Sequence, residues 1–437
     1  MKPSDPTLAD HLRRTARATP ERVALEWPGG SLTYGELDGR ADAAATALRA
    51  RGAGPGDRVA LLLPADVSFV ESFWACQRLG AVAMPIDVRL GDEERAQQTA
   101  TAALVVQQEG SGPNRCVQQI GPDPPGCTAV VIHTSGTAGS AKAVELTHAN
   151  FVWSALGSAV ALGLDPDERW LCPLPLSHVG GLSILVRSAI YGTTAVLHDG
   201  WDTERVARAL REERITLASL VPTMVARLVE HGVEAPALRC ALIGGGPLPV
   251  PVAERARAAG LPVAQTYGLT EACSQVTTSA PGEPETAGPP LVCTRVEIAA
   301  DGEILVAGAT VAPGAVADDG FLHTGDRGAL DERGRLVVTG RKADTIVTGG
   351  ENVAPAEVEA ALLAHPAVAE AAVHGRPDEE WGEAVIAKVV LRAEADPAVI
   401  RDHTATLLAR FKVPKAVEVV DDLPRTASGK IKRRDLR

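Results

Sequence analysis

The chain has 437 residues, of which 45% are hydrophobic and 22% are charged, and its formal net charge is -12. This length has room for about three domains with large buried cores, and the composition is that of an ordinary globular protein. The negative charge argues against general nucleic-acid binding, because such proteins need positive charge to displace counterions from phosphates.

Targeting and cysteine patterns narrow the class of protein further. The first residues, MKPSDPTLADHLRR, contain no apolar core of the signal-peptide type. No apolar run approaches the roughly 20 residues that span a bilayer, so the sequence predicts a cytoplasmic protein without membrane insertion. The 7 cysteines form no CxxC pair and therefore indicate neither a zinc site nor a disulfide framework.

The first part of the chain alternates between helical and strand patterns. Residues 8–20 are typical of a helix, residues 58–64 of a buried strand, and residues 66–87 of a helix followed by a strand. The segment 107–126 is rich in Gly, Pro and Gln, which indicates a connector rather than a regular element.

A loop after the predicted strand 128–132 is the first candidate for chemistry. It lies in HTSGTAGSAKAVELTHAN, residues 133–150, and it is not a P-loop, because Ala143 stands where Ser or Thr would follow Lys142. The residues after the loop alternate as in a second strand, and Thr147 is placed to cap a following helix. We therefore predict a hairpin whose amides, hydroxyls and lysine bind phosphate, with a plain Ser/Gly turn as the alternative.

Strands and helices alternate again from residue 169 to residue 268. Strands separated by helices of this length favour a parallel sheet covered on both faces, in which ligands bind at the carboxyl ends of the strands. The strand patterns lie at 169–176, 193–198, 215–222, 238–246 and 261–268, and a capped helix is predicted at 202–214.

Near Pro281 the pattern changes to hairpins. One is predicted at 294–308, with Asp301-Gly302 at its turn, and another at 328–340, with Arg333-Gly334 at its turn. From about Lys342 a smaller α+β pattern of about 95 residues follows, which is enough for one small domain. Its last helix starts at Pro397, with Asp396 as the capping residue.

Six motifs follow one another in an order that resembles the adenylate-forming enzymes, which include acyl-CoA synthetases, adenylation domains of peptide synthetases and luciferases. Each motif alone is weak to moderate, but six in this order are specific, and the resemblance extends from about Thr7 to Arg437. The motifs are the loop at 133–150, GGGPLP (244–249), QTYGLTE (265–271), HTGD (323–326), GRKADTIVTGGENVAPAEVE (340–359) and PRTASGK (424–430).

The resemblance implies an α/β fold in two parts. A large N-terminal adenylate-forming domain, 1–340, would hold parallel sheets covered by helices and a small β-barrel-like part. A small α+β C-terminal domain, 341–437, would move on a hinge. The resemblance implies ATP, Mg²⁺ and coenzyme A (CoA, a cosubstrate) as the small molecules bound, whereas the sequence leaves open a homodimer and the orientation of the two domains.

The chemistry explains why such motifs are needed. A carboxylate must attack the α-phosphorus of ATP while pyrophosphate leaves, so positive charge and hydrogen-bond donors must be aimed at the phosphates. The resemblance assigns catalytic roles to Lys430, to Glu271 as the magnesium ligand, to Thr270 beside the phosphate, and to His178. It implies that the nucleotide and CoA are bound by Thr134, Ser135, Gly136, Thr137, Lys142, Gly244, Gly245, Gly246, Tyr267, Asp326 and Arg341, with Gly349 and Gly350 lining the CoA tunnel.

Each of these residues also has a plain structural alternative. Asp326 could be a turn residue, Glu271 the start of a solvated helix, Tyr267 a core aromatic, and Lys430 part of a solvated basic tail. Two motifs depart from the family pattern. In the loop Ala138, Ala141 and Ala143 replace threonine, proline and glycine, which puts the strength of ATP binding in question, and Ala343 stands at the hinge, where relatives often carry a charge.

The acid substrate is indicated by the segments 173–198 and 266–278, which are most similar to 2-succinylbenzoate–CoA ligases of menaquinone biosynthesis. Alternatives are a CoA ligase for another aryl or medium-chain carboxylic acid and a catalytically silent nucleotide-binding protein. His178 resembles a residue at the mouth of the acyl pocket, with a packed core histidine as the alternative. The other candidates for binding the acid are Ser183, Arg187, Gly268, Ser274, Gln275 and Thr277, of which Arg187 could equally be a surface residue.

Overall fold

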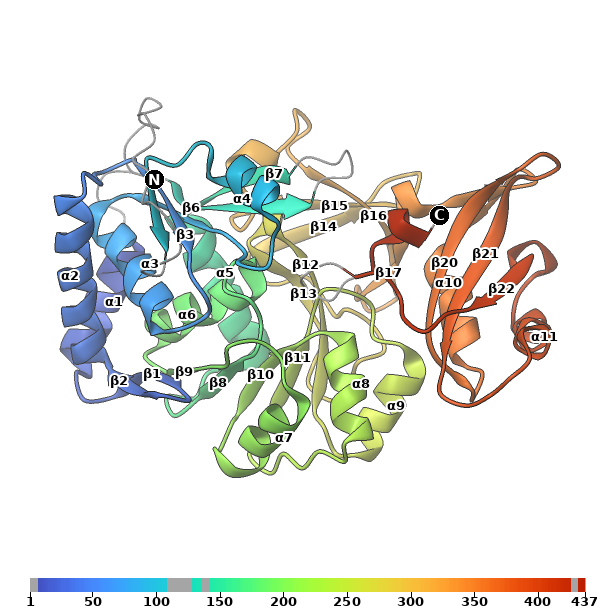
Figure 1. Cartoon of the computed structure of the whole chain (residues 1–437), viewed down its shortest axis with the longest axis horizontal. Helices are drawn as coiled ribbons and strands as arrows, with labels where there is room; N and C mark the ends of the chain where they lie inside the picture. The colour runs from blue at the N-terminus through green and yellow to red at the C-terminus, as the bar shows by residue number, and fades with distance from the viewer. Residues whose placement is uncertain (1–6, 108–127, 136–140, 426–430, 437) are drawn as a thin grey trace.

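The computed structural model describes residues 7–107, 128–135, 141–425 and 431–436. Within these ranges, three sheets are built from strands before residue 342 and one sheet from strands after it. Figure 1 shows the last sheet and its helices as a separate lobe at the right of the molecule. In the described part of the chain, no helix combines the length and the apolar character needed to cross a bilayer.

An eight-stranded sheet forms the centre of the molecule, and its six inner strands are parallel. Five of them were predicted as a parallel sheet, whereas the sixth, β1, was missed. The antiparallel edge strands were not predicted, because short edge strands lack a distinct pattern. In order across the sheet the strands are β13 (Ser274–Thr278), β12 (Val263–Leu269), β11 (Cys240–Ile243), β10 (Leu217–Leu220), β8 (Arg169–Cys172), β9 (Thr194–Leu197), β1 (Val23–Trp27) and β2 (Gly30–Thr33).

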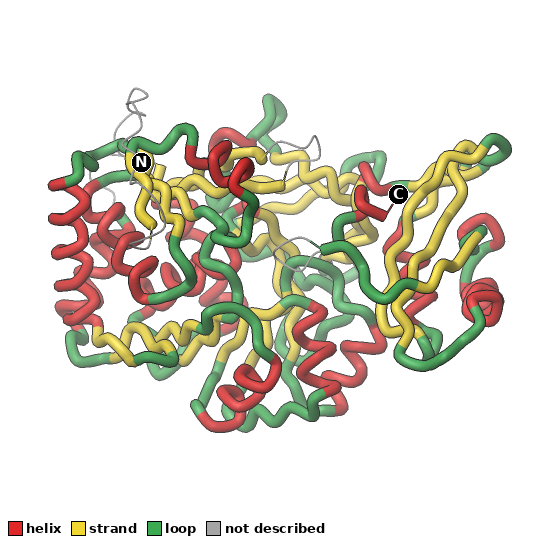
Figure 2. The backbone as a smooth tube through the Cα atoms, in the orientation of Figure 1, coloured by secondary structure: helices red, strands yellow, loops and turns green. Residues whose placement is uncertain are grey.

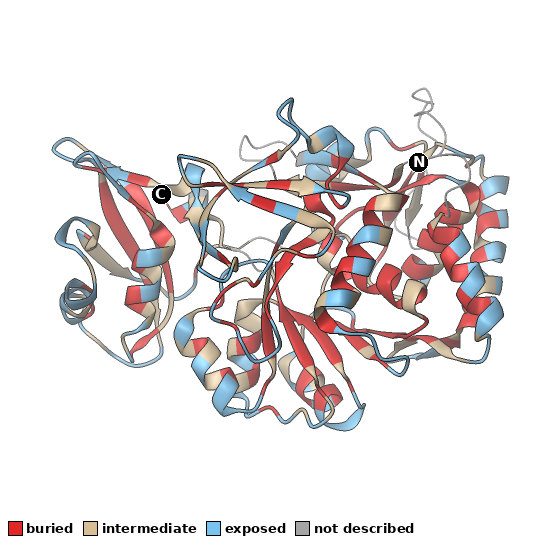
Figure 3. Ribbon diagram, turned by 180° about the vertical axis from the view of Figure 1, so that it is seen from behind, coloured by how far each residue is buried: buried red, intermediate tan, exposed pale blue. Residues whose placement is uncertain are grey.

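Helices cover both faces of this sheet, so its strands are buried on both sides (Figure 3). On β8, Trp170 and Cys172 belong to one hydrophobic cluster and Leu171 to another on the opposite face. One face packs against α5 (His148–Leu162) and α6 (Val179–Tyr191), and the other against α7 (Thr203–Glu212), α8 (Pro222–Glu230) and α9 (Val250–Ala258).

A second, five-stranded sheet contains the hairpin predicted at the start of segment 133–150. Strands β6 (Thr128–Ser135) and β7 (Ala141–Thr147) are antiparallel, and the Thr147 side chain accepts a hydrogen bond from the Asn150 amide, so the predicted hairpin and helix cap are confirmed. The remaining strands are β5 (Leu104–Gln107), β3 (Arg58–Leu62) and β4 (Val82–Pro85), and the nearby helices are α1 (Leu8–Ala18), α2 (Tyr34–Ala50), α3 (Val67–Leu79) and α4 (Asp92–Thr99).

The two predicted hairpins after Pro281 are confirmed as one four-stranded antiparallel sheet, which is the part expected to be β-barrel-like. Gly302 and Gly334 lie in its turns with φ of 84° and 72°, which side chains with a Cβ rarely adopt. Its strands are β14 (Thr294–Ile298), β15 (Glu303–Gly308), β16 (Leu322–Leu330) and β17 (Leu336–Arg341).

The last lobe has the predicted α+β pattern, with helices packed on one sheet (Figure 2). The Asp396 carboxylate accepts from the Ala398 amide at 2.8 Å, which confirms the predicted cap. Its elements are β18 (Ile346–Thr348), β19 (Glu351–Val353), α10 (Pro355–Leu363), β20 (Val368–Asp378), β21 (Gly382–Leu391), α11 (Pro397–Leu407) and β22 (Ala416–Val419).

Candidate functional site

Thr134 and Lys142, which were predicted to bind phosphate, lie near the described ends of β6 and β7. Thr134 pairs with Lys142 across the hairpin, and its hydroxyl lies 3.4 Å from the Lys142 carbonyl oxygen. Ser135 is described only as the last residue of β6, while Gly136 and Thr137 lie outside the described residues. The hairpin therefore presents the Lys142 side chain, 62% exposed, toward the neighbouring motif.

That neighbour is Glu271, in a short 3₁₀ helix, Thr270–Ala272, between β12 and β13. Lys142 Nζ lies 3.8 Å from Glu271 Oε1, so the structure brings together two residues that are 129 positions apart in the sequence. The described residues contain no group of three His, Cys, Asp or Glu side chains that could hold a metal ion. One carboxylate suits Mg²⁺, which keeps much of its water and takes further oxygen ligands from phosphates.

Asp326 on β16 is buried, and both of its oxygens are engaged. Tyr267 Oη donates to Oδ2 at 2.8 Å, and Arg341 Nε donates to Oδ1 at 2.9 Å. Burial and the charge of Asp326 raise the pKa of Tyr267, which therefore stays protonated as a donor. A buried carboxylate held by two donors can exchange one of them for the hydroxyls of a bound ribose.

Tyr267 is also a core residue, as the structural alternative proposed. Its ring belongs to a hydrophobic cluster with Val276 and Val306. Its stacking on adenine stays a prediction. The three glycines expected beside the base follow β11 directly: Gly244, Gly245 (φ 81°) and Gly246.

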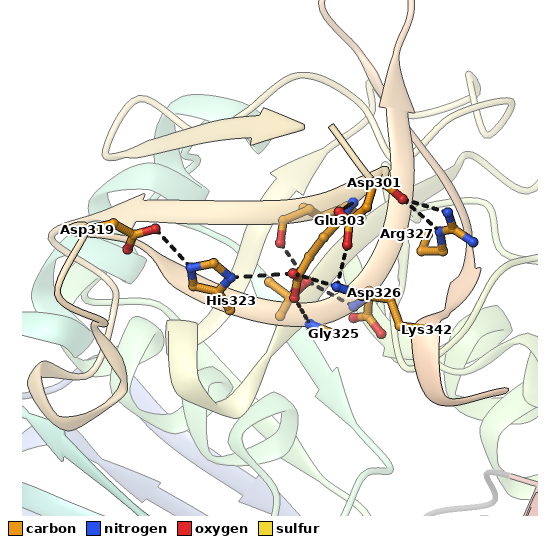
Figure 4. A network of polar contacts seen from close by, with 10 residues as sticks. Asp301, Glu303, Asp319, His323, Gly325, Asp326, Arg327 and Lys342 are labelled. Carbon is orange, nitrogen blue, oxygen red and sulfur yellow. Dashed lines mark hydrogen bonds and ion pairs between the residues drawn. The ribbon is translucent and has the colours of Figure 1, made fainter. Parts of the chain in front are cut away.

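A polar network fixes the HTGD motif and the residue after Arg341 (Figure 4). The buried Glu303 accepts from the Gly325 amide at 2.9 Å and from Lys342 Nζ at 3.0 Å, and Asp301 accepts from the same ammonium group at 2.6 Å. His323 lies between Asp319 and Glu303, and hydrogen bonds to these carboxylates raise its pKa. Although Ala343 carries no charge, Lys342 thus anchors this end of the expected hinge to β15.

His178 is the residue just before α6, where its carbonyl oxygen accepts from the Leu182 amide. Its Nε2 lies 3.8 Å from Asp87 Oδ2, at the end of β4. Asp87 is buried and accepts three hydrogen bonds from Arg89. Burial pushes the pKa of Asp87 upward, but these bonds and the Arg89 charge outweigh it, so the pKa lies below its usual value. The sequence analysis missed Asp87, although its place at the carboxyl end of a strand was a usable signal.

Arg187 is 2% exposed, which rules out the alternative of a surface residue. Its Nη2 donates to Ser154 Oγ at 3.0 Å, and its guanidinium lies 5.7 Å from the centroid of the Trp170 ring. Among the described residues no carboxylate pairs with it, and its Nε has no hydrogen-bond partner. A buried cation is costly without a carboxylate, and the described residues offer none, so this position suits a bound anion.

The other candidates for binding the acid lie on α6 (Ser183), on β12 (Gly268) and on β13 (Ser274, Gln275 and Thr277), and α6 contacts β13. Ser183 is buried, and within the described ranges its hydroxyl has no hydrogen-bond partner. The same holds for Gln275 Oε1, whereas Gln275 Nε2 donates to Thr278 at 2.9 Å. The Thr277 hydroxyl donates a hydrogen bond to the Ala287 carbonyl oxygen at 2.7 Å, so its proton is already engaged by the backbone.

The turn that leads into β13 is strained. Cys273 and Ser274 have φ of 51° and 91°, and such non-glycine conformations cost on the order of 1–3 kcal/mol each. A Cβ at Gly268 would lie 1.6 Å from the Ser274 carbonyl oxygen, so only glycine allows this approach. Strain of this kind is concentrated at functional sites, where surrounding contacts hold it in place.

In the last lobe, Gly349 and Gly350 form the β18–β19 turn with φ of 58° and 83°. A Cβ at Gly349 would lie 2.8 Å from the ring of Trp381, a residue that the sequence analysis missed. Trp381 is 36% exposed, and Lys415 Nζ lies 4.1 Å from its ring centroid. The only signal for Trp381 in the sequence is that it is the single tryptophan of this lobe. Lys430 lies outside the described residues.

Comparison with known families gives two matches. The family model described as AMP-binding enzyme matches residues 12–110 and 106–315, and the AMP-binding enzyme C-terminal domain matches residues 357–430. A relative from Bacillus licheniformis named 2-succinylbenzoate–CoA ligase is 38% identical, over 98% of this chain and 100% of the relative.

Solved structures of o-succinylbenzoate CoA synthetase from Bacillus subtilis are also similar. The structure in complex with the acyl-adenylate intermediate has a TM-score of 0.89 to this chain at 35% identity, and the match covers 98% of this chain and 97% of the other. In complex with ATP and magnesium ion, the TM-score is 0.88 at 35% identity and 98% coverage of both chains. A double mutant bound with its product analogue gives 0.72 at 35% identity and the same coverage. The overall arrangement of this chain is therefore more similar to that of the acyl-adenylate complex than to that of the product-analogue complex.

Proposed function

The chain belongs to the family of AMP-binding enzymes, and we propose that it is an AMP-forming acid–CoA ligase that acts on 2-succinylbenzoate in menaquinone biosynthesis. ATP, 2-succinylbenzoate and CoA would give 2-succinylbenzoyl-CoA, AMP and pyrophosphate. The relatives named above support the reaction. The six motifs support the nucleotide site, and the segments 173–198 and 266–278 support the acid site.

In the first half-reaction, a carboxylate oxygen of the acid forms a bond to the α-phosphorus of ATP, and the bond to the pyrophosphate oxygen breaks. Lys142 supplies positive charge to the departing phosphates. Glu271 would hold the magnesium ion, which neutralises phosphate charge when bound. Asp326 accepts the ribose hydroxyls in exchange for one of its present donors, and Thr270 lies beside the phosphate.

Arg187 is the observation that carries the substrate assignment. The proposed acid has two carboxylates, of which one reacts and the other must be held. Arg187 supplies a buried cation whose Nε has no hydrogen-bond partner in the described chain, and Ser183 and Gln275 add unpaired polar atoms on neighbouring elements. Charge-assisted hydrogen bonds from a guanidinium suit a carboxylate in both geometry and strength.

The second half-reaction transfers the acyl group from AMP to the CoA thiol, and we assign CoA binding to the last lobe. Gly349 and Gly350 would let the narrow pantetheine arm pass close to backbone. Trp381, which is 36% exposed, offers an aromatic ring for the adenine base, and Lys415, whose Nζ lies 4.1 Å from the ring centroid, offers a cation for the phosphates.

Replacing Trp381 with alanine should therefore raise the KM for CoA about 10-fold, because stacking of a base contributes roughly 1–3 kcal/mol. Pyrophosphate exchange, which reports adenylation alone, should stay as in the wild type. Trp153→Ala is the matched control, since Trp153 is similarly exposed at 44% but lies on α5. An unchanged KM for CoA in the Trp381 variant would remove this residue from the CoA site.

A substrate panel tests the proposed function as a whole. Release of AMP is measured with ATP, CoA and either 2-succinylbenzoate, benzoates or medium-chain fatty acids. Turnover of 2-succinylbenzoate with the highest kcat/KM supports the proposal. Turnover of the other acids alone would identify a different acid–CoA ligase, and binding of ATP without AMP release from any acid would identify a silent nucleotide-binding protein.

Two organisational points belong to the same proposal. We propose two domains with limits close to 1–340 and 341–437, because strand pairing changes from one sheet to another between β17, which ends at Arg341, and β18. We assign the enzyme to the cytoplasm, where ATP and CoA are available. A homodimer stays a prediction, which sedimentation of the purified chain would test.

A further inference from the structure

We propose that Ser154 is a positioning residue that couples the binding of the acid at Arg187 to the placement of Glu271. This inference rests on the proposed function, because it takes Arg187 as the group that holds the second carboxylate. Ser154 lies outside all six motifs, and its hydrogen bonds would link the binding of the acid to the position of the carboxylate that holds magnesium.

Ser154 connects the two sides through one hydroxyl group. Arg187 Nη2 donates to Ser154 Oγ at 3.0 Å, and Ser154 Oγ donates to the Cys273 carbonyl oxygen at 2.7 Å. A hydroxyl has a single proton, so when that proton is given to Cys273 the lone pairs face the guanidinium. Ser154 is 1% exposed, so solvent water does not compete for either bond.

The Cys273 carbonyl belongs to the strained turn. Cys273 and Ser274 both have positive φ, and the Cys273 amide donates back to the Thr270 carbonyl at 3.0 Å, which closes the turn around Glu271. A strained turn keeps its shape only while surrounding contacts hold it. The bond from Ser154 is therefore one of the contacts that set the direction in which the Glu271 carboxylate points.

The elements involved pack directly on one another, so the coupling needs no long path. Ser154 is on α5, Arg187 is on α6, and the strained turn leads into β13. These three elements are in mutual contact. An acid carboxylate bound to Arg187 would fix the guanidinium, and through it the Ser154 hydroxyl and the turn. An acid without a second carboxylate would leave this chain of bonds with one end unheld.

The test compares Ser154→Ala with Ser158→Ala. Ser158 is equally buried, at 1% exposure, one turn further along the same helix. For Ser154→Ala we expect the kcat of pyrophosphate exchange with 2-succinylbenzoate to fall about 10-fold, as for loss of a hydrogen bond to a charged group. We also expect a several-fold rise in the Mg²⁺ concentration needed for half-maximal exchange, whereas Ser158→Ala should keep the wild-type value.

The Mg²⁺ dependence separates positioning from mere packing. A loss of thermal stability in Ser154→Ala with unchanged Mg²⁺ dependence would overturn the inference, as would identical behaviour of the two variants. If the wild type does not exchange pyrophosphate with 2-succinylbenzoate, the proposed function falls instead. The same two variants are then compared with whichever acid the panel identifies, and equal Mg²⁺ dependence there would overturn the coupling as well.

Discussion

Replacing Lys430 with alanine is expected to slow acyl-adenylate formation about 10²–10³-fold, which is the usual effect of removing one donor aimed at transition-state charge. Lys430 ends the PRTASGK motif, and its resemblance to the lysine that enters the site for adenylation is the basis of this prediction. The measurement is pyrophosphate exchange at saturating ATP and acid. Thioester formation from supplied acyl-adenylate and CoA should stay close to the wild-type rate, because the lysine is needed for one half-reaction only.

Lys432→Ala is the matched control, since Lys432 lies two residues further along the same basic run and is anchored by its amide to the Pro424 carbonyl. Its adenylation rate should be unchanged. Equal loss of both half-reactions in the Lys430 variant would refute the division of labour between them. Equal loss in both lysine variants would show that only the total positive charge of the tail matters.

Arg187→Met is expected to lower kcat/KM for 2-succinylbenzoate by about 10²–10³-fold while raising the melting temperature. The first effect follows because breaking a buried charge pair with the acid costs about 3–5 kcal/mol. The second follows because the free protein loses a buried cation that has no carboxylate partner among the described residues, and methionine fills a similar volume. Exchange kinetics and calorimetry of the same sample measure the two effects.

Arg295→Met serves as control, because Arg295 is largely exposed and lies over the Phe321 ring. Neither its kcat/KM nor its melting temperature should change appreciably. Unaltered turnover of 2-succinylbenzoate by Arg187→Met would remove this residue from the acid site. A lower melting temperature would mean that the guanidinium contributes more through Ser154 and Trp170 than its burial costs.

Much of the fold could be predicted because its signals are local. The hairpin turns at Gly302 and Gly334, the caps at Thr147 and Asp396 and the buried parallel strands each depend on residues close together in the chain. The edge strand β2 and the long helix α2 were missed, because they carry neither strict alternation nor a strong apolar stripe. Their identity is decided by packing against elements elsewhere in the chain.

The site divides in the same way. Motif order in the sequence predicted Lys142, Glu271, Asp326 and Arg341 as site residues. The structure brings these residues into two pairs, with Lys142 at 3.8 Å from Glu271 and Arg341 at 2.9 Å from Asp326. Asp87 and Trp381 were missed, since each lies outside the motifs and is brought to its partner, His178 or Lys415, only by the tertiary structure.

The sequence by itself therefore determined the family and most of the alternation of strands and helices, and it predicted the groups that bind ATP, because the motifs that carry them are short stretches of the chain. Only the tertiary structure decided the environment of each group. From the pattern of its own helix, Arg187 could be a surface or a core residue. It is buried because α5 and β13 pack against this helix. Burial and charge pairing are sums over contacts between distant segments, so no local pattern contains them.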